Sequence, residues 1–138
     1  MVIVILGYSG AIGSNILDNL VKNNSFKLIC VGRNIKKKPH INSRIKYCRW
    51  DFKSFNKSNL LFLKKANIII NCVGKMNNKT NDLETINFDL IKKLLNYIKL
   101  SKLKVRFIHL GSVSVYGGSK SYFGRKKFIN ENRKIIIN

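Results

Sequence analysis

The chain has few acidic residues and no long apolar segment. Among its 138 residues only 6 are Asp or Glu, whereas 27 are Lys or Arg, so the formal net charge is +21. No apolar run approaches the roughly 20 residues that a membrane-spanning helix needs. No basic segment precedes the short apolar run at the N-terminus. We therefore expect neither a membrane protein nor a secretory signal peptide.

Cysteine is also scarce. The three cysteines, Cys30, Cys48 and Cys72, each lie in or beside an apolar segment. Their number is odd, and neither they nor the two histidines, His40 and His109, show the spacing of metal ligands. Free buried thiols are expected in a reducing compartment. The sequence thus predicts a cytoplasmic protein with neither a disulfide framework nor a metal site.

Alanine is nearly absent. It occurs only at positions 11 and 66, whereas Lys, Asn and Ile are abundant, a bias that is typical of AT-rich coding sequence. The positive charge by itself would indicate a nucleic-acid partner. However, the lysines are scattered, and the chain has neither aromatic stacking platforms nor a clustered basic helix. We predict no specific nucleic-acid interface, although the charge favours smaller anionic ligands such as nucleotides.

The N-terminus is the most informative segment. An apolar run over residues 1–6 stops at a glycine-rich turn, and an amphipathic helix follows at once. In such a unit the first glycine permits the tight turn, the middle one brings backbone N–H groups close to phosphates, and the last lets the helix pack on the strand. An isolated glycine pattern also fits an ordinary turn, but this context favours a diphosphate site. The turn has the pattern G-x-x-G-x-x-G and consists of Gly7, Tyr8, Ser9, Gly10, Ala11, Ile12 and Gly13.

Apolar strand-like segments alternate with helical ones along the chain. We expect strands at residues 1–6, 26–31, 45–50, 66–73, 105–110 and 134–137. We expect helices at residues 12–21, 60–63, 83–98 and 122–132. The alternation predicts an α/β fold with a doubly wound parallel sheet of about six strands, the last one incomplete, with helices on both faces. Ligands of such sheets bind at the carboxyl ends of the strands.

Two strand ends carry candidate ligand contacts. An NAD-binding protein places an acidic residue about 20 residues beyond its glycine loop, where it binds the ribose hydroxyls. This chain has Arg33 there, which would pair with a 2′-phosphate and therefore favours NADP over NAD. Alternatively, Arg33 is a solvated loop residue. Asp51, after the third strand, can accept the adenine amino group or cap the following helix, and these roles are compatible.

Further motifs occur in a characteristic order. They are Asp51-Phe52, Ile70-Asn71-Cys72-Val73-Gly74, Asn87 in the long helix, and Ser112-Val113-Ser114-Val115-Tyr116-Gly117. Together with the glycine loop they resemble the extended branch of the short-chain dehydrogenase/reductase superfamily, which comprises NAD(P)-dependent epimerases, dehydratases and reductases of nucleotide sugars. The resemblance implies a Rossmann-type fold. It also implies cofactor-binding roles for Gly7, Tyr8, Ser9, Gly10, Ala11, Ile12, Gly13, Arg33, Asp51, Phe52, Cys72, Val73, Gly74 and Asn87.

The same resemblance implies a catalytic serine, tyrosine and lysine. Ser112 matches the serine that hydrogen-bonds the substrate oxygen, and Ser114 is the less favoured choice. Tyr122 and Lys126 fit the spacing Y-x-x-x-K, which puts both side chains on one helix face, where the lysine charge lowers the pKa of the phenol. In a competing register the motif shifts by one residue. Phe123 then occupies the place of the tyrosine, and it cannot transfer a proton.

We predict a single NAD(P)-binding domain over residues 1–138, with NADP as cofactor and NAD as the alternative, and without the substrate-binding lobe of the extended family. The predicted reaction is that of an NAD(P)-dependent epimerase, dehydratase or reductase on a nucleotide-linked sugar, or the chain is the cofactor-binding portion of such an enzyme. The alternative is a non-catalytic NADP-binding or sensor module, or a degenerate fragment. An incomplete sheet would expose a hydrophobic edge, which favours a homodimer.

Overall fold

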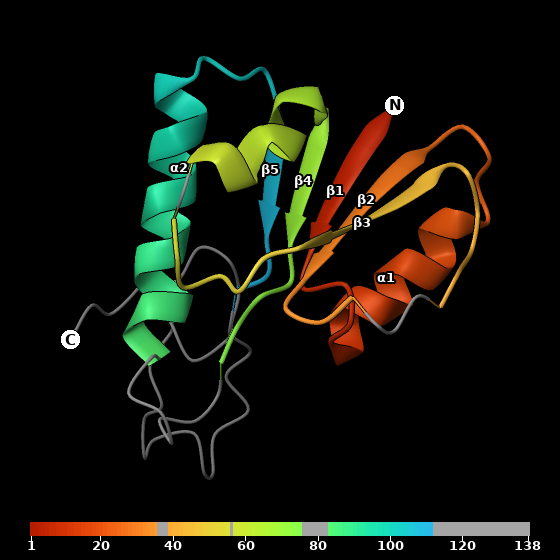
Figure 1. Ribbon diagram of the computed structural model, residues 1–138, viewed down its shortest axis with the longest axis horizontal. Helices are drawn as coiled ribbons and strands as arrows, with labels where there is room; N and C mark the ends of the chain where they lie inside the picture. Colours follow the sequence, from red (N-terminus) through yellow and green to blue (C-terminus); the bar gives the residue numbers. More distant parts are fainter. Residues whose placement is uncertain (36–38, 56, 76–82, 112–138) are drawn as a thin grey trace, which may run out of the picture.

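The computed structural model describes residues 1–35, 39–55, 57–75 and 83–111 (Figure 1). In chain order the elements are β1 (Val2–Leu6), α1 (Ala11–Val21), β2 (Lys27–Gly32), β3 (Ile45–Arg49), the 3-10 helix η1 (Lys57–Lys65), β4 (Ile68–Asn71), the π-helical segment η2 (Thr85–Asp89), α2 (Leu90–Leu100) and β5 (Arg106–His109). The predicted alternation of strands and helices is confirmed within these ranges. The predicted sixth strand and the helix before it lie outside the described residues.

The five strands form one parallel sheet in the order β3-β2-β1-β4-β5. At its centre, Ile5 of β1 lies opposite Cys30 of β2 and Ile70 of β4. The chain moves outward from β1 through β2 and β3, and then returns to the other side of β1 with β4. This reversal confirms the predicted doubly wound α/β fold. It also places the topological switch point, where such sheets bind ligands, between β1 and β4.

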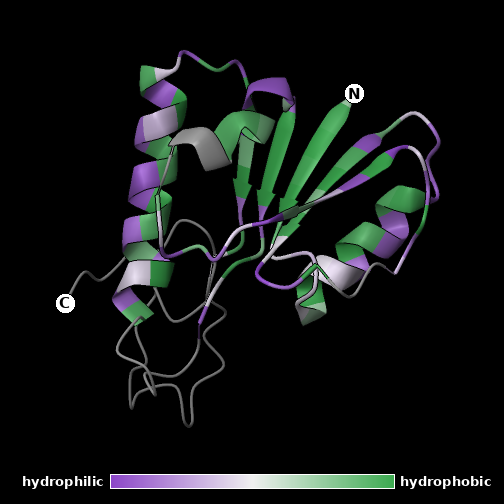
Figure 2. Cartoon of the chain, in the orientation of Figure 1, coloured by the Kyte–Doolittle hydropathy of each residue, from purple (hydrophilic) through white to green (hydrophobic). Residues whose placement is uncertain are grey.

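Alternate residues of β1 enter two hydrophobic cores, one on each face of the sheet. Val4 and Leu6 pack with residues of η1 and α2. Ile3 and Ile5 pack beneath α1, whose Leu17 is fully buried. Figure 1 shows α1 and α2 on opposite sides of the strands, and Figure 2 shows that the central strands are apolar along most of their length. The prediction of helices on both faces is therefore confirmed.

The helix predicted over residues 83–98 begins with a π-helical segment, whose turns are wider than those of an α-helix. Residues of η2 form a π-helical turn before the chain continues as α2, and Asn87 lies in that turn. Such turns interrupt the regular α-helical hydrogen bonding and are frequent near functional sites. The expected cap of this helix, Asn81, lies outside the described residues. Neither α2 nor any other helix within the described ranges is long and apolar enough to cross a membrane.

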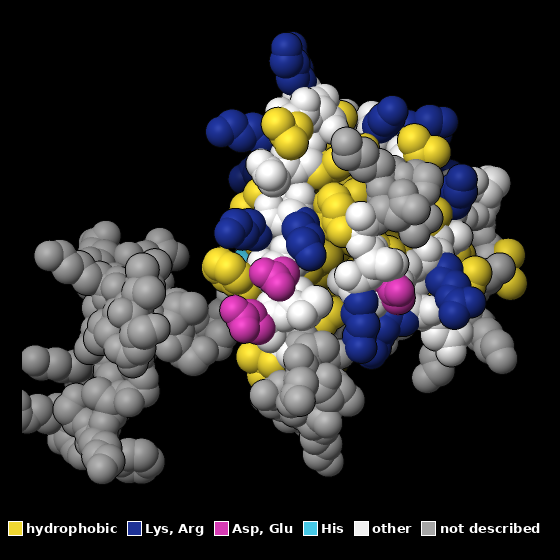
Figure 3. Space-filling model, turned by 60° about the vertical axis from the view of Figure 1, so that its left-hand side comes forward, with side chains coloured by type: hydrophobic (Ala, Val, Ile, Leu, Met, Phe, Trp, Pro, Cys, Tyr) yellow, Lys and Arg dark blue, Asp and Glu magenta, His cyan; other side chains and the backbone are white. Residues whose placement is uncertain are grey.

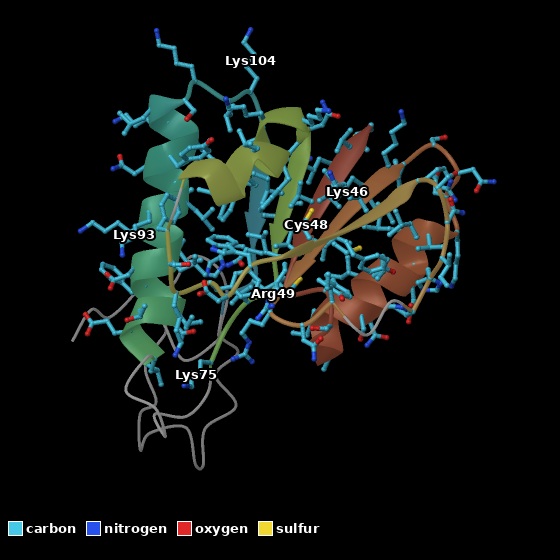
Figure 4. All side chains as sticks on the ribbon, viewed as in Figure 1. Lys46, Cys48, Arg49, Lys75, Lys93 and Lys104 are labelled. Carbon is cyan, nitrogen blue, oxygen red and sulfur yellow. The ribbon has the colours of Figure 1, made fainter. Side chains whose placement is uncertain are left out.

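The edge strands are less apolar than the sequence suggested. Lys46 and Arg49 of β3, both labelled in Figure 4, are exposed, and so is Arg106 of β5. The expected apolar strands are therefore not apolar along their whole length in β3 and β5, which are the outermost strands of the described part of the sheet. Charged side chains at such edges hinder pairing with other chains.

Arg44 joins the start of β3 to the turn between α1 and β2. Its guanidinium donates to the carbonyl oxygens of Asn23 at 3.1 Å and Phe26 at 3.0 Å, and to Oδ1 of Asn24 at 2.9 Å. These carbonyls follow the end of α1, where a helix lacks internal donors. The Arg44 guanidinium therefore supplies donors to these carbonyl oxygens and fixes the start of β3 relative to α1 and β2.

Candidate functional site

A pocket of about 280 Å³ opens at the carboxyl ends of β1, β2 and β4. It is bounded by the glycine loop, the end of β2, the residue after Asp51, the segment after β4 and the start of η2. Its lining residues are Gly7, Ser9, Gly10, Gly32, Arg33, Phe52, Cys72, Val73, Gly74, Lys75 and Ile86. Eight of the predicted cofactor-binding residues are among them: Gly7, Ser9, Gly10, Arg33, Phe52, Cys72, Val73 and Gly74.

A larger groove, of about 660 Å³, runs between η1 and α2. It lies away from the carboxyl ends of the strands, and Lys64, Lys93 and Leu100 are among its lining residues. None of the residues predicted to bind or react lines it. The smaller pocket is the candidate site, because it lies at the switch point of the sheet and contains the glycine loop.

The glycine loop has the geometry of a phosphate cradle. Gly7 has a φ of +80°, which disfavours any residue with a side chain, and its N–H donates to the carbonyl of Val31 at 2.8 Å. A Cβ on Gly13 would lie 2.2 Å from the carbonyl oxygen of Gly7, so α1 packs on the loop only because this position lacks a side chain. Gly10 precedes α1, and its N–H donates to Gly7.

The N-terminus of α1 faces this pocket. The first turn of a helix has N–H groups without acceptors inside the helix, and the helix dipole makes that end positive. Here the turn begins with Ala11, Ile12 and Gly13, next to the exposed Ser9 and Gly10. No side chain caps this end through a hydrogen bond, and such a helix N-terminus suits an anionic ligand.

The Tyr8 side chain does not line the pocket. It is 1% exposed and belongs to the core beneath α1. Its hydroxyl donates to the carbonyl oxygen of Asn34 at 3.3 Å, and its ring centroid lies 5.2 Å from that of Tyr47. Burial raises the pKa of the Tyr8 hydroxyl. Only the backbone of Tyr8 remains near the predicted ligand.

Positive charge surrounds the pocket. Arg33 and Lys75 line it, and none of its described lining residues is acidic. Arg49, in register with Gly32, lies near the same end of the sheet (Figure 4). Figure 3 shows that Lys and Arg side chains are spread over one face of the molecule rather than gathered into one patch. The pocket thus favours an anionic ligand, while the remaining charge agrees with the expected scatter of lysines.

Asp51 stabilises its own turn. Its Oδ1 accepts from the backbone N–H groups of Ser54 and Lys53, both at 3.0 Å, and from the Ser54 hydroxyl at 3.0 Å. These hydrogen bonds, led by the backbone N–H of Ser54, lower the pKa of the Asp51 carboxyl. The predicted cap of the following helix is not observed, because η1 begins only at Lys57 and Asp51 accepts within the turn before it. Contact with adenine stays a prediction, since Asp51 is not among the lining residues.

Phe52 has an unusual backbone conformation. Its φ is +64°, in the left-handed region that bulky residues rarely adopt. The side chain is 5% exposed, packs on Trp50 with ring centroids 5.0 Å apart, and lines the pocket. Trp50 is held in turn by a 2.8 Å hydrogen bond from Nε1 to the carbonyl oxygen of Ser54. The strained backbone therefore brings an apolar ring to the pocket wall.

The end of β4 is fixed by a buried amide. Asn71 is fully buried, its Nδ2 donates to Nδ1 of His109 at 3.0 Å, and its Oδ1 accepts from the backbone N–H of Val73 at 3.3 Å. Cys72 is half-buried, and burial raises the pKa of its thiol. We conclude that Cys72 is a neutral wall residue.

Asn87 holds the segment that follows. Its Oδ1 accepts from the backbone N–H of Lys75, and its Nδ2 donates to the carbonyl oxygen of Lys75, both at 2.8 Å. The amide thus pairs with the backbone much as a neighbouring strand would. Asn87 does not line the pocket. Its predicted contact with a cofactor is untested, and its observed contacts are with the pocket wall.

Three lining residues were not predicted from the sequence: Gly32, Lys75 and Ile86. Gly32 directly precedes the predicted Arg33 and closes β2. Lys75 directly follows Gly74, so the rule that ligands bind at strand ends, applied one residue further, would have found it. Ile86 gave no signal, because it fits the apolar stripe of the helix. Tyr122, Lys126 and both candidate serines, Ser112 and Ser114, lie outside the described residues.

The cysteines and histidines have structural roles in the described part of the chain. All three cysteines are free, and burial raises the pKa of Cys30 to about 12. Nε2 of His40 lies 2.7 Å from Oδ1 of Asp18, and His109 contacts Asn71. Among the described residues, no group of His, Cys, Asp and Glu could hold a metal ion.

A model of the NAD dependent epimerase/dehydratase family matches residues 3–133 of this chain. Curated proteins include no significant match. A solved UDP-glucuronic acid 4-epimerase from Bacillus cereus, in complex with UDP-glucuronic acid and NAD, has 23% identity and a TM-score of 0.78, over 99% of this chain and 46% of that one.

Two other solved structures are similar. A dTDP-glucose 4,6-dehydratase from Bacillus anthracis str. Ames, in complex with NAD, has 17% identity and a TM-score of 0.79, over 100% of this chain and 44% of that one. A short chain dehydrogenase from Leptospira borgpetersenii serovar Hardjo-bovis, with bound NAD+, has 20% identity and a TM-score of 0.70, over 88% and 55%. At such identities the likeness shows a shared fold. The chain spans less than half the length of the epimerase and the dehydratase.

Proposed function

The chain belongs to the NAD dependent epimerase/dehydratase family, and we propose that the pocket at the ends of β1, β2 and β4 binds a nicotinamide adenine dinucleotide. The observation that carries the proposal is the cradle itself: Gly7 in the left-handed conformation, Gly13 with no room for a Cβ, and the N-terminus of α1 facing the pocket. The similar solved structures contain NAD, which supports the same ligand class.

Each part of a dinucleotide has a matching part of the pocket. Backbone N–H groups around Gly10 and the first turn of α1 suit the two phosphates. The ring of Phe52 offers an apolar surface to adenine. Cys72, Val73 and Gly74 form the opposite wall, toward the nicotinamide half. When bound, the cofactor supplies hydride transfer at its nicotinamide ring.

We infer that NADP binds more tightly than NAD. Arg33 lines the pocket at the position where a carboxylate would repel a 2′-phosphate, and none of the described lining residues is acidic. Isothermal titration with NADP+ and NAD+ tests this inference. Arg33→Ala should lower the affinity for NADP+ roughly tenfold or more and leave the affinity for NAD+ nearly unchanged.

Arg49→Ala is the matched control for this titration. Arg49 is also an exposed arginine at a strand end, but it does not line the pocket. Its removal subtracts the same overall charge and should leave the ratio of the two affinities unchanged. Tighter binding of NAD+ by the unaltered chain would contradict the preference, and binding of neither dinucleotide would contradict the proposed function.

For turnover we propose an epimerase, dehydratase or reductase reaction on a nucleotide-linked sugar. Ser112 would hold the substrate oxygen, Tyr122 would move the proton at its phenolic oxygen, and Lys126 would keep a positive charge beside it. Tyr122→Phe should abolish turnover while dinucleotide binding persists. Undiminished turnover in that variant would contradict the assignment of Tyr122.

A second candidate is a non-catalytic NADP-binding or sensor module. One observation favours it: Phe123 takes the place of the tyrosine in the competing register. The module predicts dinucleotide binding without hydride exchange. Detectable exchange with any nucleotide-linked sugar would rule it out.

We further infer a single cofactor-binding domain over residues 1–138, a cytoplasmic location and self-association as a homodimer. The free cysteines support the reducing compartment. Exposed apolar side chains on or near the long helix, Phe88, Leu95 and Leu100, support self-association. Light scattering coupled to size-exclusion chromatography would test the dimer, and a monomer at micromolar concentration would contradict it.

A further inference from the structure

Tyr8 contacts both neighbours of Arg33. Its ring lies beneath Gly32, so closely that a Cβ on Gly32 would be 2.9 Å from Cε1 of Tyr8. Its hydroxyl donates to the carbonyl oxygen of Asn34 at 3.3 Å. One side chain of the phosphate-binding loop therefore touches the residues before and after the arginine that lines the pocket.

The Tyr8 ring is itself held in place. It is 1% exposed, packs in the core beneath α1 and lies 5.2 Å from the Tyr47 ring at an interplanar angle of 60°. Burial also raises the pKa of its hydroxyl, which consequently remains a donor near neutral pH. Because the Tyr8 ring is fixed by this packing, it limits the positions that the backbone at Gly32 and Arg33 can take. Gly32 is the residue type that permits this contact.

Tyr47 performs a parallel task further along the same connection. Its hydroxyl donates to the carbonyl oxygen of His40 at 2.9 Å and accepts from the His40 N–H at 3.3 Å. His40 in turn contacts Asp18 on α1. Among the described residues of the connection between β2 and β3, Tyr8 holds the part next to Arg33, whereas Tyr47 holds the part near His40.

We propose that Tyr8 is a positioning residue for recognition of the 2′-phosphate, acting through Arg33. The inference rests on the proposed function. Arg33 is an exposed, long side chain, so its reach is set mainly by where its backbone sits. Because Tyr8 belongs to the phosphate-binding loop and also holds the Arg33 turn, the diphosphate and the 2′-phosphate are bound by one connected unit.

The test compares NADP+ with NAD+, which differ only in the 2′-phosphate, by isothermal titration of the 138-residue chain. Tyr8→Phe removes the hydroxyl and keeps the ring beneath Gly32. It should weaken NADP+ binding about threefold to tenfold, as expected for one lost hydrogen bond, and leave NAD+ binding unchanged within about twofold. Tyr47→Phe is the control, because it removes the neighbouring hydroxyl but should preserve the ratio of the affinities.

A double-mutant cycle with Arg33→Ala identifies the route of the effect. If Tyr8 acts through Arg33, Tyr8→Phe has no further effect on NADP+ binding once Arg33 is truncated. Gly32→Ala supplies a second variant, since its Cβ would push against the Tyr8 ring and displace the turn; it should lower the same ratio. Circular dichroism checks that each variant is folded, and Gly32→Ala replaces Tyr8→Phe if the latter fails to fold.

Three outcomes with the variants would overturn the inference. One is an equal loss of NADP+ and NAD+ binding in Tyr8→Phe, which would mean general support of the loop. Another is an unchanged ratio of affinities in both Tyr8→Phe and Gly32→Ala. The third is an effect of Tyr8→Phe that persists in the Arg33→Ala background. Equal binding of both dinucleotides by the unaltered chain removes this inference but leaves dinucleotide binding intact, whereas binding of neither removes the proposed function as well.

Discussion

The two walls of the pocket are fixed by different forces. At the end of β2, Gly32 lines the pocket and the rings of Tyr8 and Tyr47 pack behind it. We call these three residues the aromatic wall. At the end of β4, the side-chain amides of Asn71 and Asn87 hold the backbone of the pocket-lining segment, and we call this pair the amide wall. The first depends on close packing, and the second on hydrogen bonds.

This difference sets how each wall responds to perturbation. The aromatic wall shares the core beneath α1, so it should open only when the domain unfolds. In the amide wall Asn71 is fully buried, whereas Asn87 is exposed and water competes for its hydrogen bonds. We therefore expect the segment near Lys75 to open locally at a lower free energy, and this side of the pocket to adjust to a ligand.

Removal of the Tyr8 ring should have the largest effect. Tyr8→Ala leaves a cavity beneath Gly32 and should lower the free energy of unfolding by about 3–5 kcal/mol, as for other large buried aromatic side chains. Urea denaturation followed by circular dichroism measures the change. Tyr8→Phe keeps the ring and is the control, with a loss of about 1 kcal/mol. Similar losses in both variants would mean that the hydroxyl, rather than packing, fixes this wall.

Replacement of the buried Asn71 amide should have the second largest effect on stability. Asn71→Leu keeps the volume but leaves the Val73 N–H and the His109 ring without their partner, so we expect a loss of about 1–3 kcal/mol in the same denaturation experiment. Asn67→Leu is the matched control. Asn67 precedes the same strand and accepts the Val2 N–H at 2.7 Å, but it is exposed. An equal loss in the two variants would contradict the importance of burial.

Truncation of the exposed amide should change local opening more than global stability. Asn87→Ala removes both 2.8 Å hydrogen bonds to Lys75, so the Lys75 amide should exchange its hydrogen faster, while the free energy of unfolding falls by about 1 kcal/mol or less. Hydrogen-exchange measurements by nuclear magnetic resonance follow this amide directly. Asn96→Ala, on the exposed face of α2, is the control. Unchanged exchange at Lys75 would show that Asn87 does not hold the wall.

The smallest expected effect is a pH dependence from Asp51, which lies beside the aromatic wall. Its hydrogen bonds hold the pKa of the carboxyl below its ordinary value of 3.8. A carboxyl with a lowered pKa in the folded state contributes stability above the unfolded-state value, and that contribution is lost as the pH falls toward the folded-state value. Asp51→Asn should therefore flatten the decline of stability below about pH 5. The same loss of stability at low pH in the unaltered chain and in Asp51→Asn would contradict this role.

The sequence predicted the fold well because its signals are local. Apolar runs of strand length, the helical stripe around Leu90 and the glycine spacing each depend on neighbouring residues only. Strand alternation with helices then fixes a parallel sheet, since short connections and right-handed crossovers leave few other topologies. Local signals did not distinguish β3 and β5, the outermost of the described strands, from the central ones, because strand order joins segments that are far apart in the sequence.

The seven residues of the glycine loop also show which features local sequence predicts and which depend on tertiary contacts. Its spacing predicted the phosphate cradle, and Gly7 and Gly13 have the conformation and the close approach that such a cradle needs. Nothing in the spacing indicated that the Tyr8 side chain leaves the pocket and meets Gly32. That contact joins residues 24 positions apart, and it forms only because β1 and β2 are neighbours in the sheet.

The sequence by itself therefore determined the family, the order of the elements and the turn that can hold a diphosphate, because these are properties of contiguous residues. Only the tertiary structure decided which side chains face the pocket. It turned Tyr8 into the core, committed the carboxylate of Asp51 to its own turn, and paired Asn87 with the backbone of Lys75. Those roles depend on which neighbours packing brings within hydrogen-bonding distance, and packing joins residues that the chain keeps apart.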